Sequence, residues 1–168
     1  MINDSAAGGS SNDIGRVLTL DSSGRILVTG YSVNASENCD MAIWRYNTDG
    51  TLDTTFSDDG IVINDSAAGG SSTDIGNALT LDSSGRILVA GYSYNASDNA
   101  DMAIWRYNTD GTLDTTFSDG LVINDSAAGG SSHDAGNALT LDSSGRILVA
   151  GYSYNASDNA DMVIWRYR

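Results

Sequence analysis

The chain consists of three near-copies of one unit of about sixty residues, and this repetition limits what the chain can fold into. The string Ile-Asn-Asp-Ser-Ala-Ala-Gly-Gly-Ser-Ser begins at Ile2, Ile63 and Ile123, at spacings of 61 and 60 residues. Over the ranges 63–108 and 123–168, the second and third copies agree at 42 of 46 positions. Repeats of this length build architectures in which each unit buries its apolar faces against its neighbours.

Each unit predicts four short strands separated by strong turn signals. In the second copy, we expect strands at 61–64, 78–81, 86–93 and 102–107. The segment 66–76 between the first two is polar and glycine-rich, and we interpret 67–72 within it as a flexible connector. The third of these strands is apolar on both faces, which is typical of sheets that are stacked on both sides, as the blades of a β-propeller are.

The sequence therefore predicts an all-β fold, a β-propeller built from three near-identical four-stranded blades per chain. A β-trefoil, which is also threefold with four strands per unit, is the alternative. The predicted blades are residues 1–60, 61–120 and 121–168 of one repeat domain.

Three blades do not close a ring, because propellers typically have about four to eight blades. The chain begins at the first strand of one unit and ends at the last strand of another, so we expect no strand to be available for exchange between the ends. An arc of three blades would expose apolar faces at both ends. We therefore expect the chain to bind itself, as a homodimer that forms a six-bladed ring.

The charge of the chain excludes several classes of partner. Twenty-two acidic residues face eight basic ones, which gives a formal net charge of −14. Such a surface repels nucleic-acid phosphates and anionic lipids, so we expect neither nucleic acid nor a membrane as a partner. The start of the sequence lacks the basic and apolar stretches of a signal peptide. The acidic, lysine-free composition favours a parent protein that is secreted or displayed on a cell surface.

A repeated turn rich in Asn and Asp is the candidate metal site. It reads Asn-Thr-Asp-Gly-Thr-Leu-Asp at 47–53 and again at 108–114. Oxygen side chains two residues apart, followed by Gly, resemble part of a calcium loop, although a plain Asx turn uses the same residues without a metal. Calcium is the only cofactor that the sequence suggests. Its candidate ligands are Asn47, Asp49, Asp53, Asn108, Asp110 and Asp114.

Aromatic residues supply the other candidates. Tyr94 and Tyr154 stand beside polar loops and are the candidate ligand-binding residues, since binding sites lie on loops carried by a rigid scaffold. Trp105 and its two counterparts occupy a repeated strand position, and we expect them in the core. Each Trp is followed by an Arg, which we expect to pair with a repeated Asp such as Asp101 or to lie exposed at an edge.

The sequence predicts no catalytic residues. His133 is the only histidine, and Asn12 and Thr73 are its counterparts, so a histidine triad or a zinc site is not expected. Pairs of Asp residues are the basis of glycoside hydrolysis. Here they stand mostly in turns, and near-identical copies offer no asymmetric pocket. A hydrolase that uses Asp pairs is therefore the least favoured alternative.

Three consecutive segments of the second unit, 85–93, 101–107 and 108–117, form one long motif that recurs in the first copy from Gly24 to Phe56. This motif resembles the delta-sixty tandem repeats, a bacterial family of β-propeller repeats of unknown function. One departure is Ser57 and Ser118, where that family usually has Gly. The resemblance implies a β-propeller and no particular activity.

The favoured interpretation is a non-enzymatic β-propeller that acts as a self-assembling scaffold or interaction module. The principal alternative is a multivalent, lectin-like module with one glycan site per blade. A glycan or a protein ligand is therefore the partner that we expect besides a second copy of the chain.

Overall fold

The computed structural model describes residues 2–168, and these residues form strands almost throughout. We call a set of antiparallel strands joined in chain order a ladder. Ladder 1 consists of β1 (Gly8–Leu20), β2 (Ile26–Asn34), β3 (Cys39–Tyr46) and β4 (Ile61–Asn64). Ladder 2 consists of β5 (Gly69–Leu81), β6 (Ile87–Asn95), β7 (Ala100–Tyr107) and β8 (Leu121–Asn124). Ladder 3 consists of β9 (Gly129–Leu141), β10 (Ile147–Asn155) and β11 (Ala160–Tyr167).

The prediction of an all-β fold is confirmed. The short 3-10 turn η1 (Ser118–Gly120) precedes β8. Within residues 2–168, no helix is long and apolar enough to cross a membrane.

The first strand of each repeat joins the ladder before it. β4 begins the second repeat in sequence, but it pairs with β3, so that Asn64 lies opposite Met41 and Ile61 opposite Trp44. β8 pairs with β7 in the same register. The ladders consequently run over 8–64, 69–124 and 129–167, whereas the predicted units follow the sequence repeat. The expectation that the repeat boundaries leave no strand for exchange is not supported, because β4 and β8 belong to the ladders before them and ladder 3 has only three strands among the described residues.

The prediction that the glycine-rich segment 67–72 is a flexible connector is wrong. From Gly69 onward the segment is part of β5 and pairs with β6, with register shifts between Gly69 and Asp74 and between Gly76 and Ala78. A Cβ atom on Gly70 would lie 2.4 Å from the carbonyl oxygen of Asn95. Glycine is therefore needed at Gly70 for the close approach of two strands.

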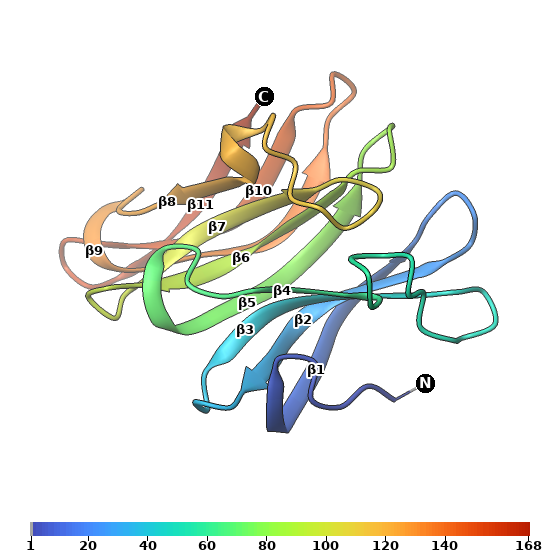
Figure 1. The fold of residues 1–168 in the computed structure, drawn as a ribbon. Helices are drawn as coiled ribbons and strands as arrows, with labels where there is room; N and C mark the ends of the chain where they lie inside the picture. The colour runs from blue at the N-terminus through green and yellow to red at the C-terminus, as the bar shows by residue number, and fades with distance from the viewer. Residues whose placement is uncertain (1) are drawn as a thin grey trace.

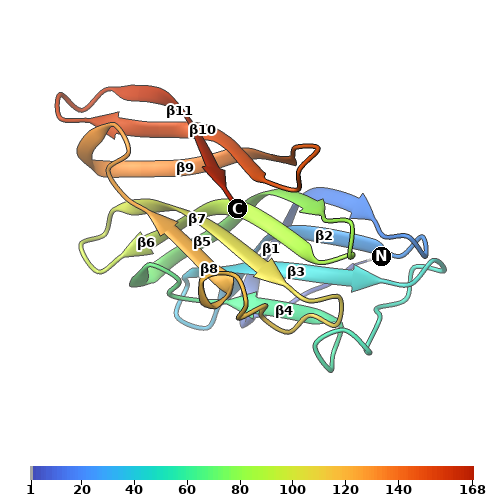
Figure 2. The same cartoon turned by 90° about the horizontal axis from the view of Figure 1, so that it is seen from above.

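The three ladders are stacked face to face (Figures 1 and 2). In β6, Ile87 and Val89 belong to the core shared with ladder 1, whereas Leu88 and Ala90 belong to the core shared with ladder 3. This arrangement confirms the prediction that the strand is buried on both faces. The first strands of the ladders are neighbours, since β1 contacts β5 and β5 contacts β9.

Seven buried positions recur in the two cores. Leu27, Met41, Ile43, Phe56, Ile87, Val89 and Trp105 in the first core correspond to Leu88, Met102, Ile104, Phe117, Ile147, Val149 and Trp165 in the second. The tryptophans lie in the core, as predicted. Each indole N–H donates a hydrogen bond to an asparagine 41 positions earlier: Trp44 to Asn3, Trp105 to Asn64 and Trp165 to Asn124.

Candidate ligand pocket between the first two ladders

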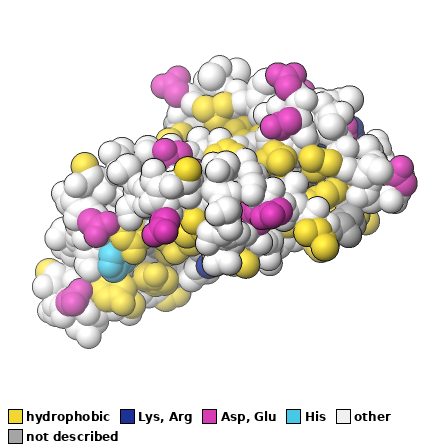
Figure 3. All heavy atoms as spheres, turned by 60° about the horizontal axis from the view of Figure 1, so that its bottom comes forward, with side chains coloured by type: hydrophobic (Ala, Val, Ile, Leu, Met, Phe, Trp, Pro, Cys, Tyr) yellow, Lys and Arg dark blue, Asp and Glu magenta, His cyan; other side chains and the backbone are white. Residues whose placement is uncertain are grey.

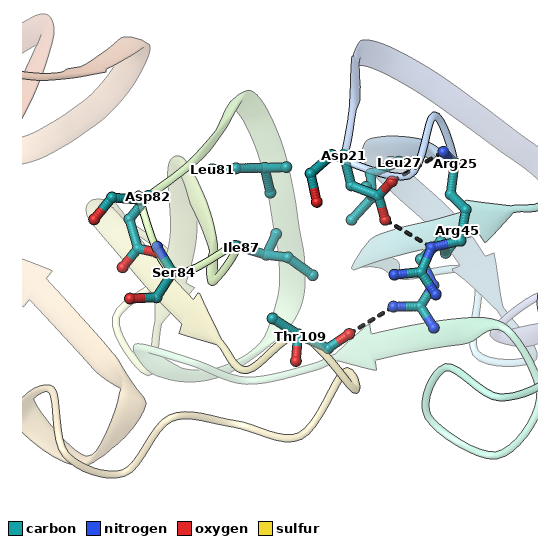
Figure 4. A pocket seen from close by; sticks show the side chains of 12 residues that line it. Asp21, Arg25, Leu27, Arg45, Leu81, Asp82, Ser84, Ile87 and Thr109 are labelled. Atoms are coloured by element: carbon teal, nitrogen blue, oxygen red, sulfur yellow. Dashed lines mark hydrogen bonds and ion pairs between the residues drawn. The ribbon is translucent and has the colours of Figure 1, made fainter.

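A cavity of about 350 Å³ lies where ladder 1 meets ladder 2 (Figure 4). One wall comes from the β1–β2 turn, β2 and β3, and the other from the β5–β6 turn, the ends of β5 and β6, and the turn after β7. The lining residues are Asp21, Ser22, Arg25, Leu27 and Arg45 from ladder 1, and Leu81, Asp82, Ser83, Ser84, Gly85, Ile87 and Thr109 from ladder 2.

The sequence Asp-Ser-Ser-Gly-Arg builds the rim of this pocket. Asp21 Oδ1 accepts hydrogen bonds from the backbone N–H groups of Ser23 (2.8 Å) and Arg25 (2.9 Å), which closes an Asx turn. Gly24 supplies the positive φ of +79° that the turn needs. Asp21 Oδ2 then accepts from Nε of Arg25 at 2.7 Å. The turn therefore fixes the guanidinium of Arg25 at the mouth of the pocket.

A buried ion pair lies behind the rim. Nε of Arg45 is 2.8 Å from Oδ2 of Asp53, and both side chains are almost fully buried. Nη1 of Arg25 reaches the same carboxylate oxygen at 3.3 Å, while about a third of the Arg25 side chain stays exposed. Nη1 of Arg45 crosses the junction and donates to the carbonyl oxygen of Thr109 at 2.5 Å. Two guanidinium groups are thus held in place by one carboxylate.

The carboxylates of the pocket are ionised at neutral pH. Hydrogen bonds from Thr55 and the charge of Arg45 lower the pKa of Asp53, although burial opposes the shift. Burial alone would raise the pKa of Asp21, but hydrogen bonds from Arg25 and Ser23 outweigh it and lower that pKa. The pKa of Asp82 is lowered in the same way by Arg86 and Ser84.

The pocket combines a charge-balanced wall with an apolar one. Arg25 and Arg45 offset Asp21 and Asp82 in the lining, although the whole chain carries a formal charge of −14. Leu27 and Ile87 are buried, and with Leu81 they form the apolar wall, beside which Ser84 is exposed. Fixed hydrogen-bonding groups next to an apolar surface suit a neutral ligand that has several hydroxyl groups.

The junction between ladders 2 and 3 carries the same residue types. Nε of Arg86 is 2.6 Å from Oδ2 of Asp82, and its Nη1 is 3.3 Å from Oδ2 of Asp114. Nε of Arg106 lies 2.8 Å from that same oxygen. Ile147 of ladder 3 belongs to the core at this junction, as its counterpart Ile87 does at the first. The charge network of the first junction therefore recurs at the second.

The candidate calcium ligands lie in two turns, and the carboxylate oxygens among them accept hydrogen bonds within the chain. Oδ1 of Asp49 accepts from the N–H and the hydroxyl of Thr51, and Asn47 donates to that hydroxyl. The turn at 108–114 repeats these bonds. Among residues 2–168, no three His, Cys, Asp or Glu side chains are grouped so that they could hold a metal ion. Calcium binding at these turns stays a prediction.

The expectation that the repeated Arg pairs with a repeated Asp is confirmed, but the Asp is not the one given as the example. Arg106 pairs with Asp114 and not with Asp101. Asp101 instead accepts hydrogen bonds from Nδ2 of Asn95 at 3.0 and 3.2 Å.

Tyr94 and Tyr154 lie away from the pocket, in a row of half-buried rings that spans ladders 2 and 3. Tyr94 and Tyr154 flank His133, with ring centroids 5.8 and 6.1 Å from that of the imidazole. Figure 3 shows the histidine (cyan) bordered by hydrophobic side chains. Tyr92 and Tyr152 complete the row, with centroids 6.0 and 5.9 Å from those of Tyr94 and Tyr154, respectively. Shallow grooves lie next to the row, over 66–72 and 95–98 in ladder 2 and over 126–132 and 155–158 in ladder 3.

The sequence analysis did not identify the residues that line the pocket. Arg25 and its counterparts Arg86 and Arg146 follow the same Asp-Ser-Ser-Gly turn in all three copies. That repetition was the available signal. It could not reveal that the turn of one unit faces the apolar strand of the next.

Comparison with known proteins identifies the fold. A family described as a domain of unknown function (DUF5122) with a beta-propeller fold matches residues 22–56, 83–117 and 143–168, together more than half of the chain. No curated protein matches the chain. Among solved structures, a fucose lectin from Kordia zhangzhouensis in complex with methyl-fucoside is similar, with 18% sequence identity and a TM-score of 0.51. The similarity covers 88% of this chain and 90% of the lectin chain. At this identity, the similarity concerns the fold.

Proposed function

This chain belongs to the DUF5122 family of β-propellers, and we propose that it is a carbohydrate-binding module whose sugar sites lie between neighbouring blades. In this proposal each ladder is one blade, and the repeats are of the delta-sixty type. Glycans are displayed outside cells, so a secreted or cell-surface parent protein suits this function.

The pocket between ladders 1 and 2 carries the proposal. A pyranose offers hydroxyl groups on its edge and C–H groups on its face, so its binding site needs fixed polar groups beside an apolar wall. Arg25 and Ser84 supply the polar groups, while Leu27, Leu81 and Ile87 supply the wall. Because the lining charges balance, the pocket favours a neutral sugar over an anionic one.

The solved structures add one supporting observation. The Kordia lectin, whose fold this chain shares, was solved with methyl-fucoside. Fucose is a neutral 6-deoxy sugar, and its methyl group would be matched by an apolar wall. We therefore propose neutral hexoses with an apolar edge, 6-deoxyhexoses included, as the ligand class.

The electrostatics of the pocket favour binding over hydrolysis. Glycoside hydrolysis needs one carboxylic acid that stays protonated near neutral pH beside a second, ionised carboxylate. Asp21, Asp53 and Asp82 all have lowered pKa values, because hydrogen bonds and arginines hold them ionised. We propose no catalytic role for them.

A scaffold role is the second candidate, and a different observation favours it. Large hydrophobic side chains are exposed at both ends of the stack of ladders, among them Leu18 and Met162. Such patches mark interaction surfaces. The two functions are compatible, because self-association would leave the junction between ladders 1 and 2 intact.

A glycan array of neutral and anionic sugars tests the proposal. We expect binding to neutral glycans, and we expect no binding to sialylated or sulfated ones, because the chain is strongly acidic. Replacing Arg25, Arg86 and Arg146 together by Lys keeps the charge but removes the guanidinium fork. Loss of a charge-assisted hydrogen bond of about 1.5–3 kcal/mol weakens binding by roughly tenfold or more.

Arg168→Lys is the matched control, because Arg168 is exposed and lies outside the pocket. It should bind as the unmodified chain does. Absence of binding to every glycan on the array would refute the proposal. Unchanged binding by the variant with Arg25, Arg86 and Arg146 replaced by Lys would also refute it. Repeating the titration with EDTA tests whether calcium contributes to binding, since the candidate calcium turn at 108–114 supplies Thr109 to the pocket.

A further inference from the structure

The outer face of ladder 3 is a copy of a face that ladder 2 buries. Met102 and Ile104 are 0% exposed where ladder 2 packs on ladder 3. Their counterparts in ladder 3, Met162 and Ile164, are 76% and 63% exposed. The strand β11 also has an unpaired edge, since it pairs only with β10 among the described residues.

The outer face of ladder 1 copies the opposite face of ladder 2. Leu79 is 9% exposed in the core between ladders 1 and 2, whereas its counterpart Leu18 is 65% exposed. Likewise, Ile75 is 5% exposed and its counterpart Ile14 is 40% exposed. The two ends of the stack are therefore the two complementary halves of one interface that the chain already contains twice.

Ile2 and Asn3 are the counterparts of Ile63 and Asn64, which end the strand β4 at the internal junction. At the internal junction, Asn64 lies opposite Met41 in β3, and its Oδ1 accepts from the indole of Trp105 in the next ladder. Asn3 makes the same bond to Trp44, at 3.0 Å. Asn3 is thus anchored in ladder 1 as Asn64 is in ladder 2, and the neighbouring Ile2 is 95% exposed.

We propose that two copies of this chain associate head to tail, with ladder 3 of each copy packed on ladder 1 of the other. In the internal register, Asn3 and Ile2 of one copy add to β11 of the other, opposite Met162 and Val163. A heterologous interface of this kind forms a ring when its rotation closes. Propellers have about four to eight blades, and with three ladders per chain only two copies fall within that range.

The association creates a binding site that neither copy holds alone, and this consequence rests on the proposed function. Ladder 3 presents Asp142, Ser143, Arg146, Leu148 and Arg166, the counterparts of Asp21, Ser22, Arg25, Leu27 and Arg45. The second copy presents Leu20, Asp21, Ser22, Ser23, Gly24, Ile26 and Thr48, the counterparts of Leu81, Asp82, Ser83, Ser84, Gly85, Ile87 and Thr109. The full lining of the observed pocket is therefore restored at each junction between copies.

Light scattering coupled to size-exclusion chromatography tests the association without any sugar. The unmodified chain has a mass of 17.5 kDa, so we expect a species of about 35 kDa, twice that mass. Leu18→Asp and Ile164→Asp each place a charge on one end, and each should yield the 17.5 kDa monomer. Ser157→Asp lies in an exposed loop and should stay dimeric.

Mixing the two variants distinguishes head-to-tail association from other dimers. Leu18→Asp keeps an intact ladder 3 face and Ile164→Asp keeps an intact ladder 1 face. An equimolar mixture should therefore regain a dimer through one intact junction. A monomeric unmodified chain, an open-ended series of oligomers, or a dimer that only one of the two variants dissociates would overturn the proposal.

A covalent trap gives a reading that does not depend on folding of the charged variants. A chain that carries Cys39→Ala, Ile2→Cys and Val163→Cys together should form disulfides between copies. Residues directly opposite each other on paired strands have neighbouring Cβ atoms, as a disulfide requires. We expect a covalent dimer on a non-reducing gel, and an uncrosslinked chain would contradict the register. When a sugar is titrated, the dimer should bind more sugar molecules per chain than the monomeric Ile164→Asp variant. Equal site numbers with an intact dimer would refute only the shared pocket.

Discussion

The repeated arginine of the third strand in each ladder stands in three different environments, which makes its stability contribution predictable. Arg45 is almost fully buried, with Nε 2.8 Å from Asp53 and Nη1 bound to the carbonyl of Thr109. Arg106 makes the same 2.8 Å contact with Asp114, but 13% of its side chain is exposed. Arg166 is exposed, and among residues 2–168 no carboxylate pairs with it.

Replacement of each arginine by Met should therefore have graded effects on the free energy of unfolding. Arg45→Met leaves a buried carboxylate with only the partly exposed Arg25 as its cationic partner, and should cost about 3 kcal/mol. Arg106→Met removes a less buried partner and should cost about 1–2 kcal/mol. Arg166→Met should stay within about 0.5 kcal/mol.

Urea unfolding followed by tryptophan fluorescence measures these differences. The three variants are compared in the Ile164→Asp background, so that association does not cover Arg166. Equal losses at all three positions, or a larger loss at Arg166 than at Arg45, would refute the assignment of stability to burial of the ion pair.

Three further predictions concern the backbone and core. Burial raises the pKa of Asp40 to about 6, so the stability that its protonated form contributes is present below about pH 4 and is lost as the pH rises through 6. Asp40→Asn should therefore be more stable than the unmodified chain by about 1–3 kcal/mol at pH 7. In urea titrations this difference should vanish near pH 4. A Cβ on Gly91 would lie 1.8 Å from the carbonyl oxygen of Ile75, so Gly91→Ala should cost more than about 3 kcal/mol or prevent folding, as circular dichroism would show. Asn64→Ala removes the acceptor of the Trp105 indole and should cost about 1–3 kcal/mol in the same urea assay, whereas an unchanged midpoint would contradict the role of this bond.

Much of the fold could be predicted from the repeat and from the strand patterns. The strands β4, β6 and β7 lie close to their predicted ranges, because these segments are rich in Ile, Val and Tyr and are bounded by clear turn residues. The first half of β5 could not be predicted. Its glycines and serines have low strand propensity, and the pairing depends on a close approach to β6 that only glycine permits at Gly70.

The candidate site was less predictable than the fold, because it depends on contacts between units. The sequence analysis singled out the Arg that follows each Trp. It could not predict the contact of Arg45 across the junction, because the residue contacted, Thr109, is 64 positions away. The pairing of Arg45 with Asp53 is local, yet it was missed because Asp53 was interpreted as a metal ligand. Tyr94 and Tyr154 drew attention as loop aromatics, and the structure places them together around His133, outside the pocket.

The most direct test of the account is a crystal structure of the chain with a neutral 6-deoxy sugar such as methyl-fucoside. We predict the sugar in the cavity between ladders 1 and 2, with its hydroxyl groups near Arg25 and Ser84 and its apolar edge against Leu27 and Ile87. A sugar found instead in the shallow groove over 66–72 and 95–98 would contradict the assignment of the site, and so would an empty cavity at saturating sugar.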